Sequence, residues 1–252
     1  MHTFSASQII KYMSDPWLWV MKSLFKMKEP MNPYAIKGIV FGDFVETAAV
    51  KGHWDGDGIV ELIKNRISDD CLKAGCEIPS LSNIEQDWLA ARDYFKSREN
   101  KGYDKPIKNQ HEFIFESKHG KVKGYIDLLY PRAVMDIKYR SEVQKDNRCS
   151  DMIQLACYWK ATGHRQFLLE ICKGKVKQSA YGQEELEPYW KIAEHNMSIM
   201  SGIIDRVKDI RYNNPDYTER CVMLGTLGEM PIHNPDGFWW PEALKLREEI
   251  LG

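Results

Sequence analysis

The stretch GYIDLLYPRAVMDIKYRS, residues 124–141, places two aspartates and a lysine inside an otherwise apolar, strand-like run. Pro131-Arg132 interrupts the run with a turn signal, so the stretch predicts a β-hairpin. Asp127 and Asp136 are nearly symmetric about this turn, and we expect them to lie roughly opposite each other. A charged residue in a strand core is destabilising unless it is paired or binds a metal. The hairpin therefore predicts both a sheet and a candidate site.

Periodicity on either side of the hairpin predicts an α/β fold. The sequence HEFIFES at 111–117 is strand-like and completes an antiparallel meander with the hairpin, and further strands are expected at 166–172 and 175–181. The helical patterns cover 5–25, 35–51, 58–75, 83–99, 150–162 and 184–210. We expect Ser5 or Ser7 to cap the first of these and Pro16 to divide it. The alternation of helices and strands predicts a mixed central sheet flanked by helices.

Composition narrows the functional class. The chain has 252 residues, of which 43% are hydrophobic and 28% charged, as in an ordinary globular protein. Its formal net charge is −1, so any nucleic-acid contact must come from a local basic patch. No signal-peptide pattern and no apolar run of about 18 residues is present, which predicts a cytoplasmic protein without a membrane partner. The six cysteines form no CxxC pair, which favours reduced thiols.

The charges of the hairpin favour a metal site. Residues two apart in a strand share a face, so Asp136 and Lys138 are expected on one face and Ile137 on the other. Two carboxylates this close either share a proton or hold a cation, and oxygen ligands favour Mg²⁺ or Mn²⁺. Lys138 would then orient or deprotonate a water molecule, or stabilise charge developing on a phosphate. A structural ion pair between neighbouring strands is the alternative.

Two predicted helices supply further candidates. Gln154 and Tyr158 are four apart and share a helix face, although they could equally be a surface amide and a core residue. Glu46 lies on the predicted helix at 35–51 and is a third candidate carboxylate. The neighbouring Asp43 could be mistaken for it, and a glutamate on an amphipathic helix is usually solvated.

Taken in order, these motifs resemble the PD-(D/E)XK nuclease superfamily in its RecB-like and CRISPR-associated exonuclease branch. The motifs are Glu46, GYID ending at Asp127, DIK at 136–138 and QLACY at 154–158. The opening FSASQIIKYMSDPWLW is similar to the N-terminal signature of that branch, and the resemblance covers about residues 4–172. It implies a single nuclease domain over 1–252. Within it, a helical segment at 1–34 would precede a restriction-endonuclease-like core at 35–182 and a helical extension at 183–252.

The resemblance also implies roles for these residues. Asp127 and Asp136 would be metal ligands, aided by Glu46 and the backbone carbonyl of Ile137, in metal-assisted hydrolysis of a phosphodiester. The catalytic lysine would be Lys138, and Gln154 and Tyr158 would position the site or the DNA. Basic residues near the site could track a DNA backbone, although solvated loops would look the same; they are Lys123, Arg140, Lys145 and Arg148.

One departure from the branch concerns iron–sulfur chemistry. Some members carry a cysteine before the proline where this chain has Asp15-Pro16, and Cys221 stands alone in the C-terminal part. We therefore expect no iron–sulfur cluster. The function implied is a Mg²⁺- or Mn²⁺-dependent DNA exonuclease in recombination, repair or phage DNA processing, acting as a homo-oligomer or with a recombination protein. The alternatives are a structure-specific endonuclease and a non-catalytic DNA-binding or assembly protein on the same fold.

Overall fold

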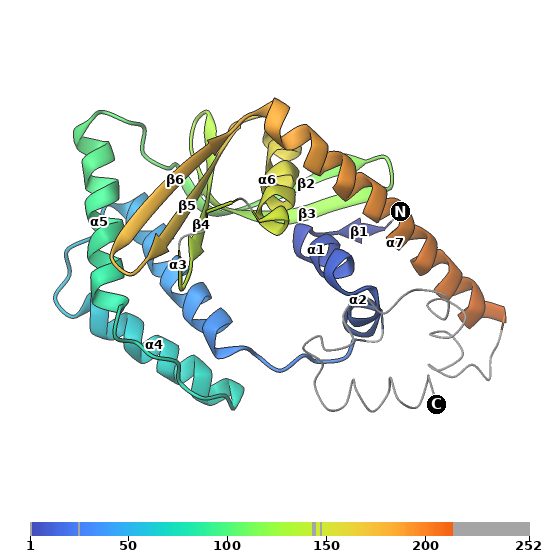
Figure 1. The fold of residues 1–252 in the computed structure, drawn as a ribbon, viewed down its shortest axis with the longest axis horizontal. Helices are drawn as coiled ribbons and strands as arrows, with labels where there is room; N and C mark the ends of the chain where they lie inside the picture. Colours follow the sequence, from blue (N-terminus) through green and yellow to red (C-terminus); the bar gives the residue numbers. More distant parts are fainter. Residues whose placement is uncertain (1, 25, 143–144, 147, 214–252) are drawn as a thin grey trace. The chain divides into compact units, whose positions relative to one another are not determined.

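The computed structural model describes residues 2–24, 26–142, 145–146 and 148–213 (Figure 1). Most of the predicted C-terminal extension, with Cys221, lies outside these residues. Close contacts divide the chain into two compact units. The hairpin unit comprises the described residues of Met31–Phe113 and Tyr125–Glu187, and the terminal unit comprises the described residues of 1–30, 114–124 and 188–213. The predicted segmentation of a single nuclease domain stays a prediction.

Four complete helices of the described chain belong to the hairpin unit, and local sequence explains where they begin and end. They are α3 (Pro33–Lys51), α4 (Ile59–Ala74), α5 (Ile84–Asn100) and α6 (Cys149–Thr162). The Asn32 side chain accepts a hydrogen bond from the Tyr34 N–H, and Pro33 occupies the first helical position of α3. Left-handed glycines end three of the helices, because only glycine adopts this conformation without strain; they are Gly52, Gly75 and Gly163.

The sheet of the hairpin unit is mixed, as predicted. Its strands are the first part of β2 (Lys108–Ser117), which pairs with β3 (Gly120–Leu129), the second half of β3, then β4 (Ala133–Tyr139), β5 (Arg165–Cys172) and β6 (Lys175–Tyr181). The β3–β4 pair is antiparallel, β4 runs parallel to β5, and β5 runs antiparallel to β6. Leu128 pairs with Met135 and Leu129 with Val134, which confirms the predicted hairpin around Pro131-Arg132.

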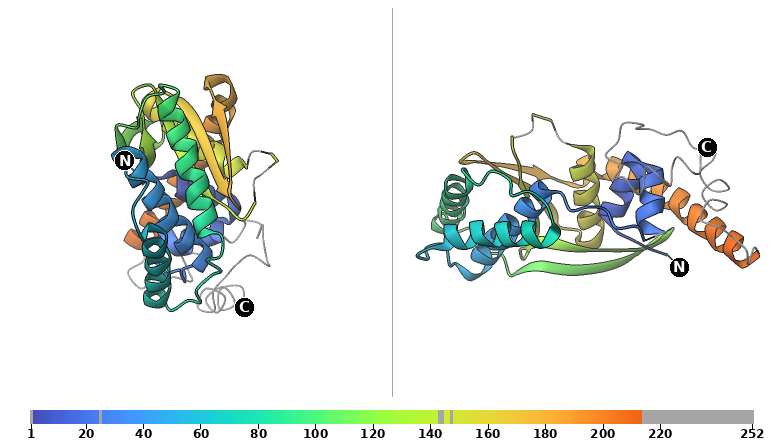
Figure 2. Two further views of the ribbon diagram at one scale, coloured as in Figure 1. Left: turned by 90° about the vertical axis from the view of Figure 1, so that its left-hand side faces the viewer. Right: turned by 90° about the horizontal axis from the view of Figure 1, so that it is seen from below.

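Helices cover both faces of this sheet. The main core packs buried residues of α3, α4 and α5 against alternate strand residues such as Met135, Ile137, Leu169 and Ile171. Figure 2 shows α5 running along β5 and β6. Asp136 and Lys138 alternate with these core residues and face α6, because Lys138 donates a hydrogen bond to a residue of that helix. The α/β class with a mixed sheet flanked by helices is thus confirmed.

The terminal unit holds both ends of the described chain. It contains β1 (Thr3–Phe4), α1 (Ala6–Ser14), α2 (Pro16–Ser23), parts of β2 (Lys108–Ser117) and β3, and most of α7 (Gln183–Asn213). Ser5 caps α1 in a capping box with Gln8, and Pro16 starts α2, as the sequence predicts. The two-residue β1, which runs parallel to β3, was not predicted. Trp17 and Trp19 are core residues of the fold, 2% and 1% exposed.

Candidate functional site

The β3–β4 hairpin carries the two aspartates on adjacent strands. Continued by one residue beyond the Leu128–Met135 pair, the register sets Asp127 opposite Asp136. The Ile137 N–H donates a hydrogen bond of 2.8 Å to Asp127 Oδ2. The backbone of β4 therefore fixes the Asp127 carboxylate beside Asp136, as the sequence predicts from the spacing about the turn.

A polar chain extends from β4 to α6. Lys138 Nζ donates to Asp136 Oδ1 at 3.1 Å and to Gln154 Oε1 at 2.9 Å. Gln154 Nε2 in turn donates to the Tyr158 hydroxyl at 2.5 Å. Asp136 is completely buried and Tyr158 is 3% exposed. The structure thus brings together the predicted strand pair and the predicted helix face.

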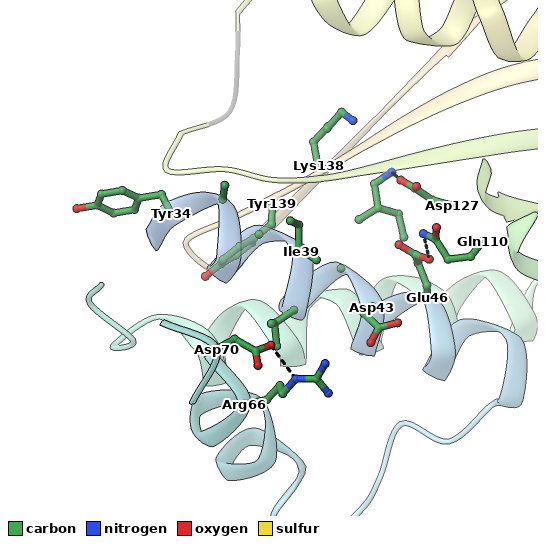
Figure 3. A pocket seen from close by; sticks show the side chains of 15 residues that line it. Tyr34, Ile39, Asp43, Glu46, Arg66, Asp70, Gln110, Asp127, Lys138 and Tyr139 are labelled. Carbon is green, nitrogen blue, oxygen red and sulfur yellow. Dashed lines mark hydrogen bonds and ion pairs between the residues drawn. The ribbon is translucent and has the colours of Figure 1, made fainter. Parts of the chain in front are cut away.

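Glu46 reaches the same hairpin from the other side of the sheet. It lies on α3 and is 5% exposed, whereas Asp43 is exposed to solvent. Gln110 Nε2 donates a hydrogen bond of 2.7 Å to Glu46 Oε2. Figure 3 shows Glu46 and Asp127 extending from α3 and β3 into one pocket, whose volume is about 720 Å³. We call it the acidic cavity; Lys138 and Asp43 also line it.

Burial and mutual repulsion shift the ionisation of these groups. Burial, with the charge of Asp127, raises the pKa of Glu46 to about 8. Burial and the Asp136 carboxylate raise the pKa of Asp127 to about 7. Burial also raises the pKa of Asp136, against the opposing effect of Lys138. The site therefore holds more carboxylate groups than it can keep charged near neutral pH without an additional cation.

For Lys138, the neighbouring carboxylates affect the pKa more than burial does. Burial alone would lower its pKa, but Asp136 and Asp127 together outweigh burial, so the pKa of Lys138 lies above its ordinary value. Its ammonium group is therefore charged in this arrangement. A charged amine at this position donates hydrogen bonds and compensates negative charge, and it does not accept a proton.

The donor set suits a hard divalent cation. Asp136 Oδ2 is buried and lacks a hydrogen-bond partner within the described residues, although Lys138 Nζ lies 2.9 Å away. With Asp127 and Glu46 nearby, the donors are all carboxylate oxygens, which Mg²⁺ and Mn²⁺ prefer. No cluster of three His, Cys, Asp or Glu side chains in the described parts of the chain is already arranged around a metal position. The carboxylates would therefore have to adjust their rotamers to share an ion.

The basic residues predicted to contact DNA differ in their surroundings. Lys145 and Arg148 are exposed just before and at the start of α6, which leaves them accessible. Lys123 belongs to the terminal unit. The Arg140 side chain is only 9% exposed and forms ion pairs with Asp151 and Glu170. Arg140 therefore has a buried structural pairing, and its contact with DNA stays a prediction.

Gln110 is the residue of the site that sequence reasoning missed. It is exposed, lies in β2 and has a φ of 47°, a left-handed conformation that non-glycine residues rarely adopt. Such strain often accompanies function, because the surrounding structure must impose it. A glutamine in a polar strand gives no sign of this conformation, so the sequence carried no usable signal.

No protein-family model matches this chain, and no curated protein matches it. Solved structures do match its fold. A crystal structure from Eubacterium rectale, of a protein named a "putative exonuclease", aligns with a TM-score of 0.51 and 15% sequence identity. The alignment covers 77% of this chain and 78% of that chain. The protein SSO0001 aligns with a TM-score of 0.40 and 12% identity over 77% of this chain and 75% of its own. At 15% identity, the likeness to the Eubacterium rectale protein concerns the fold alone.

Proposed function

We propose that this chain is a metal-dependent nuclease of the PD-(D/E)XK type that hydrolyses phosphodiester bonds in DNA. The observation that carries the proposal is the hairpin itself. Asp127 and Asp136 lie on adjacent strands, and Lys138 bridges Asp136 to Gln154. A protein scaffold gains little from burying like charges together, whereas metal-assisted phosphodiester hydrolysis requires them.

Each residue has a role that its surroundings support. Asp127, Asp136 and Glu46, with the Ile137 carbonyl, would hold Mg²⁺ or Mn²⁺, which would activate water and polarise the phosphate. Lys138, charged in this site, stabilises negative charge that develops on the phosphate oxygens. Gln154 accepts a hydrogen bond from Lys138 and is itself hydrogen-bonded to Tyr158, so this pair holds the ammonium group in position.

Digestion from a DNA end is the form of activity that we propose. The Eubacterium rectale protein of similar fold is named a putative exonuclease, which supports this choice over internal cleavage. Recombination, repair or phage DNA processing would use such an activity in the cytoplasm, with a second copy of the chain or a recombination protein as partner. Among the described helices, none combines the length and apolar character needed to cross a bilayer.

Replacing the lysine tests the proposal. With Mg²⁺ or Mn²⁺, the unchanged protein should digest end-labelled linear DNA and leave covalently closed circular DNA intact. Lys138→Ala should reduce digestion by at least about 100-fold, because it removes the preorganised charge at the phosphate. Lys160→Ala is a matched control, since Lys160 is a similarly half-buried lysine that pairs with Glu187 at 3.2 Å, away from the cavity.

Three results would contradict parts of the proposal. Absence of metal-dependent cleavage on single-stranded DNA, double-stranded DNA and RNA would refute the nuclease assignment. Nicking of closed circular DNA would replace the exonuclease with an endonuclease. Cleavage that persists in Lys138→Ala but is lost in Lys160→Ala would place the active site elsewhere.

A further inference from the structure

A second cavity adjoins the acidic cavity in the hairpin unit. Its volume is about 520 Å³, and it shares Tyr34 and Tyr139 with the acidic cavity. Lys37 and Lys173 line it, so we call it the basic cavity. Asp87 is the carboxylate that lines it. Two neighbouring cavities with opposite charge preferences are suited to different parts of one ligand.

Asp87 makes the wall of the basic cavity rigid. This residue of α5 is 1% exposed, and both of its carboxylate oxygens have a donor. The Tyr139 hydroxyl donates to Asp87 Oδ2 at 2.7 Å, and the Gly174 N–H donates to Oδ1 at 2.6 Å. Asp87 therefore joins α5, the end of β4 and the β5–β6 turn. A cavity whose walls are fixed in this way is preorganised for a ligand.

The β5–β6 turn places Lys173 at an unfavourable backbone position. Lys173 has a φ of 47° and Gly174 a φ of 70°, the two consecutive positive values of a type I′ hairpin turn. Asparagine or glycine is preferred at the first of these positions, because glycine has no Cβ atom to clash and the asparagine side chain can hydrogen-bond to the local backbone. The presence of lysine at this point, on the rim of a cavity, indicates that its ammonium group serves a purpose other than turn formation.

The charges around the basic cavity leave it favourable for an anion. Lys37 lies 5.3 Å from the centre of the Tyr139 ring and donates to the Ser80 carbonyl at 2.7 Å. Burial lowers the pKa of Lys37, and the attraction of Asp87 offsets only part of this effect. An anion in the cavity would compensate the partly buried ammonium group more fully. Arg140 also lines the cavity, but Asp151 and Glu170 neutralise its charge.

We propose that the basic cavity holds a backbone phosphate of the same nucleic-acid strand whose scissile phosphate occupies the acidic cavity. Lys173 and Lys37 contact this phosphate. Tyr34, which lines both cavities and is 72% exposed, stacks on a base between the two phosphates. The inference rests on the proposed nuclease function, since it assigns the acidic cavity to the scissile phosphate.

Lys173→Asn separates ligand binding from folding. Asparagine suits the left-handed position better than lysine, so the variant should melt at the same temperature as the unchanged protein or above it. The same variant should weaken binding of a fluorescent single-stranded oligonucleotide, measured by anisotropy in EDTA, by roughly fivefold, the upper end for one exposed ion pair. The slope of log affinity against log salt should become less negative by about 0.7, as expected for the loss of one phosphate contact. Lys175→Asn, at an exposed lysine two residues away on β6, should change neither quantity.

The outcomes distinguish this inference from the proposed function. Equal affinities and salt slopes for Lys173→Asn and Lys175→Asn would overturn the phosphate site, as would failure of the unchanged protein to bind the oligonucleotide. If binding depends on Lys173 but no variant or metal yields cleavage, the phosphate site stands and the nuclease proposal fails. If DNA is cleaved and Lys173→Asn leaves KM unchanged, the nuclease stands and the phosphate site fails.

Discussion

Glu46 illustrates, at the scale of single residues, how a surface amide can control a buried charge. Burial and the neighbouring carboxylates raise its pKa to about 8, while the hydrogen bond from Gln110 acts in the opposite direction. Gln110 therefore favours the charged form, which is the form that a metal requires. Gln110 does not contact a reacting atom, so we regard it as a positioning residue.

Gln110→Ala should shift the pH at which activity appears to a higher value. Loss of the hydrogen bond raises the pKa of Glu46 further, so the rising limb of the pH–activity profile should move to higher pH. At neutral pH we expect activity to fall by about fivefold, equivalent to roughly 1 kcal/mol for one hydrogen bond. Asn109→Ala is the neighbouring control on β2. An unshifted profile with a uniformly lower rate would indicate a purely structural effect.

The sequence could predict some of these residues because strand alternation is strict. Asp136 and Lys138 had to share a face, and the turn at Pro131-Arg132 set Asp127 beside them. Strand alternation predicts the face on which a long side chain lies, but it does not predict the residue with which that side chain pairs. Arg140 belongs to the same face, yet its pairing with Asp151 and Glu170 depends on how α6 and β5 pack.

Helices and strands were predictable where their patterns are long and their ends are marked. The expected helix at 83–99 corresponds to α5 (Ile84–Asn100), and the expected strand at 166–172 corresponds to β5 (Arg165–Cys172). The two-residue strand β1 has no periodicity to detect, and its pairing with β3 is a tertiary effect. The hydrogen bonds by which Asp87 connects three parts of the fold are also tertiary effects. They could not be predicted from the sequence, since the two partners are 52 and 87 residues away in the chain.

Asp87→Ala should destabilise the protein strongly, because one side chain joins three elements. Its removal leaves the Tyr139 hydroxyl and the Gly174 N–H without their acceptor, at a cost of about 1 to 3 kcal/mol for each group. We expect a loss of roughly 2 to 4 kcal/mol in the free energy of unfolding, measured by urea denaturation. Asp87→Asn should restore part of it, since an amide can still accept from Gly174 and donate to Tyr139.

Asp93→Ala provides the comparison on the same helix. Asp93 is an exposed residue of α5 that pairs with Arg92, and surface changes of this kind usually alter stability by less than about 0.5 kcal/mol. Equal effects of Asp87→Ala and Asp93→Ala would show that the hydrogen bonds of Asp87 do not stabilise the hairpin unit.

For the whole molecule, a net charge of −1 conceals a concentration of carboxyl groups in one cavity. Global composition therefore could not predict where a polyanionic ligand would bind. The acidic cavity would repel a phosphate unless a cation is present, whereas the basic cavity beside it would attract one. Metal binding and nucleic-acid binding should consequently reinforce each other in the intact protein.

The stability of the whole protein should depend on pH with a sign set by the raised carboxyl pKa values. Glu46 and Asp127 have ordinary pKa values of 4.5 and 3.8 and folded values of about 8 and about 7. The folded state therefore binds more protons than the unfolded state between about pH 4 and pH 8. Without divalent ions, stability is fully present below about pH 4 and is lost as the pH rises through 7 to 8.

Thermal melting in EDTA at about pH 5.5 and pH 8 measures this effect. We expect the melting temperature to fall by roughly 10 to 20 °C at the higher pH, corresponding to about 5 kcal/mol from the two carboxyl groups together. Mg²⁺ or Mn²⁺ should reverse the loss of stability at pH 8 and have little effect at pH 5.5, because at pH 5.5 a metal must displace the protons that the carboxylates hold.

Glu46→Gln should reduce both the pH dependence and the metal effect, since it removes one titrating ligand. The exposed Glu61 on α4 provides the control Glu61→Gln, which should reproduce the unchanged protein. A melting temperature that rises between pH 5.5 and pH 8 in EDTA would contradict the buried carboxylate cluster, and with it the metal site.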